Sequence, residues 1–140
     1  MSGVVYLADT SAYLRLGRGE HVEEWASKAA AGVVAVCPAV EAEVLFTARG
    51  REDYRDMCEE FRTAVGWVPM PDNVWVRVRA VQDQLAERSR HRAASVVDLL
   101  VAATAEMSGL TVLHYDRDFE TIATVTGQPV EWLAKPGSLN

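Results

Sequence analysis

Asp98 is the only charged residue between Ala93 and Ala105. A carboxylate with so many apolar neighbours is expected to be partly desolvated, and an unpaired buried charge is costly. No Lys or Arg lies in this segment, so a partner must come from elsewhere in the fold, and a metal ion is the obvious one. The residue also fits a structural role, because Ser95 and Asp98 have the spacing of a capping box at a helix start. The two roles are compatible, since a carboxylate at a helix N-terminus can face a cleft.

Further acidic residues follow apolar, strand-like segments or stand near the start of a helix. In an open parallel sheet, ligands bind outside the edge at which the strands end. We therefore expect these acidic side chains to converge there with Asp98. The acids are Asp9 after the segment 4–8, Asp116 and Asp118 after the segment 110–114, and Glu43 or Glu41 in a helix that begins at Pro38.

Converging carboxylates without basic partners repel one another unless protons or cations neutralise them. Oxygen ligands in this number suit Mg²⁺ or Mn²⁺ rather than Zn²⁺, and the three His residues show no zinc-binding pattern. Such a site suits metal-assisted hydrolysis of a phosphodiester. One ion lowers the pKa of a bound water, a second stabilises the leaving oxygen, and an outer acid orients the water.

Each acid also has a purely structural interpretation. Asp9 and Asp118 are suited to turns or helix caps. Asp116 fits a loop, and Glu43 fits a solvated helix face. Spacing does not choose between Glu41 and Glu43, because both have apolar neighbours one turn away. The convergence of several acids, rather than any single residue, supports the metal site.

Apolar runs and helical patterns alternate along the chain, which predicts a mostly parallel sheet with helices on its faces. We expect a three-layer α/β/α sandwich with about five strands. Residues 1–134 form one domain in this interpretation, and residues 135–140 form a loose tail. The expected strands are 4–8, 33–37, 66–69, 110–114 and 129–133. The expected helices are a short one capped by Thr10 or Ser11, then 21–31, 38–49, 52–64, one capped by Asp72 that runs to about residue 90, 95–109 and 119–126.

The chain has 140 residues, of which 49% are hydrophobic, and this suits a single ordered domain. Its net charge of −6 disfavours a nucleic-acid partner at face value. However, 12 of the 14 basic residues are Arg, which suits phosphate contacts. The clusters at 49–55, 77–79 and 88–92 are either solvated helix faces or part of a phosphate-binding surface.

No apolar stretch is long enough to span a bilayer, and the N-terminus lacks the features of a signal peptide. Cys37 and Cys58 lack the spacing of metal ligands, and Cys37 lies in an apolar run that predicts a buried free thiol. We therefore expect a cytoplasmic protein without membrane contacts.

Four motifs together resemble the PIN-domain nucleases, and specifically the VapC-type toxins of bacterial toxin–antitoxin pairs. The resemblance covers residues 4 to about 132, and the order and spacing of the motifs are specific although each is short. The motifs are LADTS at 7–11, EVLFTAR at 43–49, VDLLVAATA at 97–105 and LHYDRDF at 113–119.

The resemblance implies a Mg²⁺-dependent endoribonuclease that acts as a homodimer and is inhibited by a small VapB-type antitoxin. The complex of the two proteins would bind operator DNA through the antitoxin. The family pattern also selects Glu43 over Glu41. By resemblance, the acidic metal site comprises Asp9, Glu43, Asp98 and Asp116, with Asp118 nearby and Thr10 or Ser11 positioning water or phosphate.

Three other interpretations compete with this one. A phosphoaspartyl phosphatase or receiver domain needs a Lys near the phosphoryl group, but the only two are Lys28 in a surface helix and Lys135 in the tail. A non-catalytic module with the nuclease fold would usually have lost an acid, and none is missing here. A PIN nuclease of RNA processing, which is not a toxin, has no distinguishing feature in the sequence.

Overall fold

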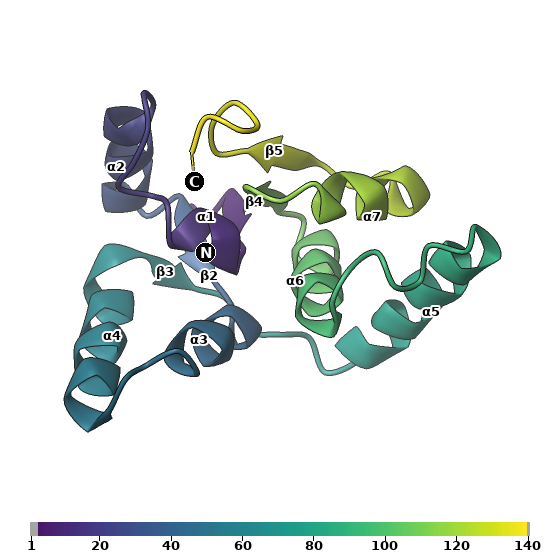
Figure 1. Ribbon diagram of the computed structural model, residues 1–140, viewed down its shortest axis with the longest axis horizontal. Helices are drawn as coiled ribbons and strands as arrows, with labels where there is room; N and C mark the ends of the chain where they lie inside the picture. The colour runs from purple at the N-terminus through teal and green to yellow at the C-terminus, as the bar shows by residue number, and fades with distance from the viewer. Residues whose placement is uncertain (1–2, 140) are drawn as a thin grey trace.

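The computed structural model describes residues 3–139. Within that range the strands are β1 (Tyr6–Ala8), β2 (Val34–Val36), β3 (Gly66–Trp67), β4 (Thr111–His114) and β5 (Val130–Trp132). They form one sheet in the order β3-β2-β1-β4-β5, with β1 at its centre (Figure 1). Every pair is parallel, so the sheet predicted to be mostly parallel is wholly so in this range.

The helices in the described residues are α1 (Thr10–Tyr13), α2 (Val22–Ala30), α3 (Pro38–Leu45), α4 (Arg51–Ala64), α5 (Val74–Glu87), α6 (Val96–Met107) and α7 (Asp118–Thr126). The chain moves outward from β1 to β3 and then returns past β1 to β4 and β5. Crossovers between parallel strands are right-handed. The helices that connect β1 to β3 and those that connect β4 to β5 therefore lie on opposite faces of the sheet. In Figure 1, α2 and α4 lie on the left and α5 and α7 on the right. This arrangement is the predicted three-layer α/β/α sandwich.

The inner strands β1, β2 and β4 are mostly apolar and buried, as expected for parallel strands between two helix layers. Leu7, Val34 and Val112 are all fully buried. Helix α6 contacts β1 and β4, and its residues 99–105 are all buried. The small side chains in this segment let the helix approach the sheet closely. The packing fixes the N-terminal end of α6, where Asp98 lies.

Several helix boundaries differ from the prediction by one or more residues, and for two of them the structure shows the cause. Helix α3 ends at Leu45 rather than near residue 49, and the Thr47 hydroxyl donates to the Val44 carbonyl at 2.7 Å, just beyond its end. Helix α5 is not capped by Asp72. Instead, the Val74 N–H donates to the Pro71 carbonyl at 3.0 Å, so a backbone turn starts the helix. The apolar residues of α5 at 74, 78, 81 and 85 are buried, as their spacing predicted.

Cys37 is buried and both cysteines are free thiols, which confirms the prediction for Cys37. None of the helices in residues 3–139 is both long enough and apolar enough to cross a bilayer.

The segment 135–140 was predicted to be a loose tail. Residue 140 lies outside the described residues, and Leu139 makes hydrogen bonds to Tyr115. The Tyr115 hydroxyl accepts a hydrogen bond from the Leu139 N–H at 2.5 Å and donates to the Leu139 carbonyl at 2.7 Å. Just before this segment, the Trp25 indole N–H donates to the Leu133 carbonyl at 2.9 Å. No local sequence pattern indicates these contacts, because each joins residues far apart in the chain.

Tyr115→Phe removes both hydrogen bonds to Leu139 but keeps the aromatic ring. We expect it to lower the free energy of unfolding by about 1 kcal/mol and to speed hydrogen exchange at the Leu139 amide, measured by thermal unfolding and NMR. Tyr54→Phe is the matched control, because the half-exposed Tyr54 side chain makes no hydrogen bond. Unchanged exchange at Leu139 would show that the segment is held by other contacts.

Candidate active site

Asp9 follows β1 directly and is almost completely buried, at 3% exposed. Its Oδ1 accepts the Ala12 N–H at 2.9 Å, so Asp9 itself caps α1. The prediction of Thr10 or Ser11 as the cap was therefore wrong, because the helix begins one residue earlier. The Ser11 hydroxyl contacts both Asp9 oxygens, at 2.8 and 2.9 Å, and holds the carboxylate in place.

The loop after β4 carries two more acids and is tied to α1. The Tyr115 N–H donates to the Ser11 hydroxyl at 2.9 Å, which links this loop to the Asp9 cap. The Asp116 N–H donates to Nδ1 of the buried His114 at 3.3 Å. The Asp118 N–H then donates to Oδ1 of Asp116 at 2.9 Å. The loop is therefore ordered by its own side chains.

Asp98 lies at the start of α6 in the capping box that its spacing predicted. The Asp98 N–H donates to the Ser95 hydroxyl at 3.1 Å, and Oδ2 of Asp98 accepts the Ser95 N–H at 3.4 Å. The same residue also faces a cleft. The structural and functional interpretations of Asp98 are thus both compatible with its position.

Glu41 and Glu43, which spacing could not separate, point to different neighbours. Oε1 of Glu43 accepts a hydrogen bond from the Thr10 hydroxyl at 2.5 Å. Oε1 of Glu41 instead accepts the indole N–H of Trp67 at 2.9 Å. Only Glu43 of the two lines the cleft that contains Asp9 and Asp98.

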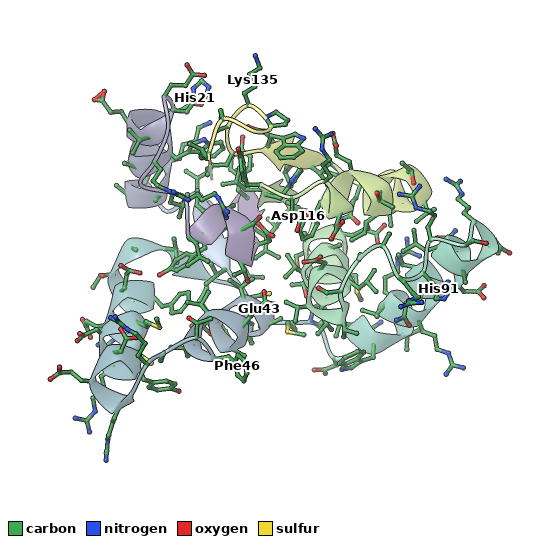
Figure 2. The ribbon with its side chains drawn as sticks, viewed as in Figure 1. His21, Glu43, Phe46, His91, Asp116 and Lys135 are labelled. Atoms are coloured by element: carbon green, nitrogen blue, oxygen red, sulfur yellow. The ribbon has the colours of Figure 1, made fainter. Side chains whose placement is uncertain are left out.

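A cleft of about 460 Å³ gathers all seven residues that the sequence suggested. Oxygens of Asp98, Asp116 and Asp118 lie within 4.8 Å of one another. Figure 2 shows Glu43 and Asp116 on separate elements, α3 and the loop after β4. The residues that line the cleft are Asp9, Thr10, Ser11, Leu14, Arg15, Glu43, Ser95, Asp98, Asp116 and Asp118.

Burial and mutual repulsion raise the pKa values of Asp9, Asp98 and Asp118. Burial raises the pKa of Asp98 to about 7, with the Asp116 charge as the next cause. Burial also raises the pKa of Asp9 to about 6, against the lowering effect of hydrogen bonds from Ala12 and Ser11. The pKa of Asp118 is raised by burial and by the Asp116 charge. A bound cation would relieve the same repulsion, so this set of hard oxygen donors fits a divalent ion.

Sequence reasoning missed two residues beside this cluster. Arg15 lines the cleft. In the sequence, only its positive charge one helical turn after Ser11 could have indicated this position. His114 is fully buried between the rings of Phe119 and Trp132. Burial lowers the pKa of His114 to about 4, so its ring is neutral and Nδ1 can accept the Asp116 N–H.

The model of the PIN domain family matches residues 6–125. The chain belongs to the PIN-domain family. This result rules out the phosphatase and receiver-domain interpretations. It also agrees with the order of motifs around the four acids that suggested the family.

This PIN domain is similar to curated relatives from Mycobacterium tuberculosis. It is 44% identical to Ribonuclease VapC21 over 107 residues, which is 76% of this chain and 78% of the relative. It is 33% identical to Ribonuclease VapC18 over 138 residues, which is 97% of this chain and 100% of the relative. A chain in the crystal structure of DNA-bound VapBC from Salmonella typhimurium has the same fold. That match has a TM-score of 0.77 at 17% identity and covers 94% of this chain and 99% of that one.

The stability of the metal-free PIN domain is expected to fall as pH rises from about 4 to 7. The folded state holds a proton on Asp98 up to about pH 7, whereas the ordinary pKa is 3.8. The stabilisation that comes from this proton on Asp98 is therefore complete below pH 4 and lost above pH 7. Asp98→Asn should remove much of this loss and raise stability at pH 8 by roughly 1–3 kcal/mol.

The measurement is thermal unfolding in EDTA between pH 5 and 8. Asp83→Asn serves as the control, because Asp83 is exposed on α5 and lies outside the cleft. This variant should keep the pH dependence of the wild type. Equal pH dependence in Asp98→Asn and wild type would show that Asp98 does not carry the buried negative charge.

Proposed function

We propose that this chain is a Mg²⁺-dependent endoribonuclease that acts as the toxin of a cytoplasmic toxin–antitoxin pair. Mn²⁺ is the alternative ion for the same oxygen ligands. The observation that carries the proposal is the cluster of Asp98, Asp116 and Asp118 oxygens within 4.8 Å in an open cleft. The names of the curated relatives support an RNA substrate.

We assign the cation to Asp9, Glu43, Asp98 and Asp116, with Asp118 beside them, because an oxygen of Asp118 lies within 4.8 Å of oxygens of Asp98 and Asp116. Hydrogen bonds from Ser11 and Ala12 fix the Asp9 carboxylate before any ion binds. The Thr10 hydroxyl occupies one oxygen of Glu43, and the other makes no hydrogen bond to the protein. When bound, the ion acidifies a water molecule and offsets the charge that develops on the phosphate.

Asp118 is suited to the proton transfer that hydrolysis requires. Its raised pKa means that it takes up a proton more readily than an ordinary Asp. It is anchored to Asp116 through its backbone N–H, which leaves its carboxylate on the cleft side. We assign Asp118 the role of accepting the proton of the attacking water. Thr10 and Ser11 act by orienting Glu43 and Asp9.

The toxin role implies a VapB-type antitoxin, and apolar side chains at the surface support a protein partner. Phe46, just beyond α3, is 90% exposed and points away from the domain (Figure 2). Val76 and Trp75 on α5 are 73% and 57% exposed. A homodimer and an antitoxin would cover such residues. Operator DNA would be bound through the antitoxin, because this chain carries a net charge of −6.

Two alternatives remain within the same family. A non-catalytic binding module would not need the acids, yet all of them line one cleft here. A PIN nuclease of RNA processing would use the same chemistry without an antitoxin. The toxin role, unlike that alternative, implies a gene for a small DNA-binding protein next to the gene for this chain.

Asp9→Asn, Asp98→Asn and Glu43→Gln should each reduce RNA cleavage by at least about 100-fold, because each removes a charged ligand. The assay is incubation of purified protein with total RNA, with and without Mg²⁺, followed by mapping of the cut ends. Glu41→Gln is the matched control on the same helix and should cleave like wild type. Full activity in Asp9→Asn and Asp98→Asn would refute the assigned site.

Mg²⁺ or Mn²⁺ at millimolar concentration should raise the melting temperature of the wild type, because the ion binds only the folded state. A shift of a few degrees is expected, which corresponds to about 1–3 kcal/mol at 10–100 times the Kd. Asp98→Asn should show a much smaller shift. The absence of a metal-dependent shift in the wild type would contradict a preformed site.

A further inference from the structure

Among residues 3–139, Arg15 is the only basic residue that lines the acidic cleft. We propose that Arg15 is a further catalytic residue, which binds the RNA phosphate through the part of its guanidinium that the protein leaves unpaired. The proposal rests on the ribonuclease function proposed above. The carboxylates then bind the metal cation, and Arg15 binds the anionic phosphate of the substrate.

Contacts within the protein fix the orientation of the guanidinium. Nη1 of Arg15 donates to the Ser11 carbonyl at 2.9 Å. The guanidinium carbon lies 5.1 Å from the centre of the Tyr115 ring, which places the group over an aromatic face. Tyr115 is itself held by Leu139 through its hydroxyl. Arg15 is therefore positioned before a substrate arrives, which reduces the entropy lost on binding.

The opposite edge of the same guanidinium has no partner. Within residues 3–139, the hydrogen bond of Nη1 is the only one that the Arg15 side chain makes. Nε is buried without a hydrogen bond and is enclosed by protein atoms. Nη2 is therefore the donor left for an anion that the described residues do not supply.

Arg15 makes no ion pair with a described residue, although it lies in a cleft with several carboxylates. Five carboxylates line the cleft with Arg15, yet the ion pairs among residues 3–139 do not include Arg15. An arginine that served to neutralise the acids would be paired with one of them. Here the main chain of Ser11 and the ring of Tyr115 hold it instead, so its charge remains available.

A phosphodiester is a ligand whose charge matches this guanidinium. Its non-bridging oxygens accept N–H donors from a planar guanidinium, whose fixed directions an ammonium group does not reproduce. Charge is spread over these oxygens in the transition state of phosphoryl transfer, so a fixed guanidinium stabilises it. Arg15 should therefore affect kcat as well as KM.

The test uses a short RNA that contains one cleavage site mapped for the wild type. Arg15→Gln should lower kcat/KM by at least about 100-fold, with a fall in kcat itself. Arg15→Lys keeps the charge but loses the planar guanidinium that Ser11 and Tyr115 orient, and it should recover less than a tenth of the lost activity. Mn²⁺ affinity, measured by titration, should stay within about threefold of the wild type in both variants.

Arg51→Gln is the matched control, because Arg51 is an exposed arginine at the start of α4 and lies outside the cleft. It should cleave like the wild type. A purely structural Arg15 would give a different pattern. Both Arg15 variants would then melt at a lower temperature and bind Mn²⁺ more weakly than the wild type. If only the charge of Arg15 mattered, Arg15→Lys would recover full activity. Each of these two results, and also cleavage by Arg15→Gln within about threefold of the wild type, would overturn the proposal.

A binding assay separates this inference from the proposed function. In the Asp98→Asn background, which should not cleave, fluorescence anisotropy with the same RNA should show at least about tenfold weaker binding after Arg15→Gln. If the wild type fails to cleave RNA but this difference is found, the nuclease function fails and the phosphate contact stands. If the wild type cleaves RNA and neither binding nor kcat depends on Arg15, the inference alone fails.

Discussion

Repulsion between carboxylates that the fold forces together is the physical constraint behind the cleft. The central strand β1 and its neighbour β4 run in parallel and end at the same edge of the sheet, so Asp9 and the acids after β4 cannot separate without breaking the sheet. Helix α6 adds Asp98 because its buried face is locked against those two strands. Packing of the apolar core thus keeps these carboxylates close together despite their repulsion. A bound cation would reduce that repulsion, so the site is suited to binding cations.

Hydrogen bonds from small polar side chains make this arrangement rigid. Ser11 contacts the Asp9 carboxylate and accepts the Tyr115 N–H, so one hydroxyl joins the segments that follow β1 and β4. Thr10 performs a similar role towards Glu43 on α3. These two residues lie next to each other in the chain but orient acids from different elements. A site of this kind depends on its supporting hydroxyl groups as much as on the carboxylates themselves.

Much of the fold and of the acidic cluster could be predicted from the sequence, because the relevant signals are local. The apolar runs before Asp9 and Asp116 predicted strands, and the Ser95–Asp98 spacing predicted a capping box that the structure contains. The choice between Glu41 and Glu43 needed a family resemblance, since only three-dimensional neighbours distinguish them. Arg15 was missed because its significance lies in the contacts that it does not make, which no sequence pattern records.

The bond between Leu139 and the Tyr115 hydroxyl has a consequence for substrate binding. Tyr115 supports the Arg15 guanidinium and is tied to Ser11 through its backbone. Loss of the bonds to Leu139 would leave the sheet and the acids in place, and it would free the Tyr115 hydroxyl while the ring keeps its edge contact with Trp132. Under the proposed role of Arg15, such a molecule would hold the substrate phosphate less firmly while still folded.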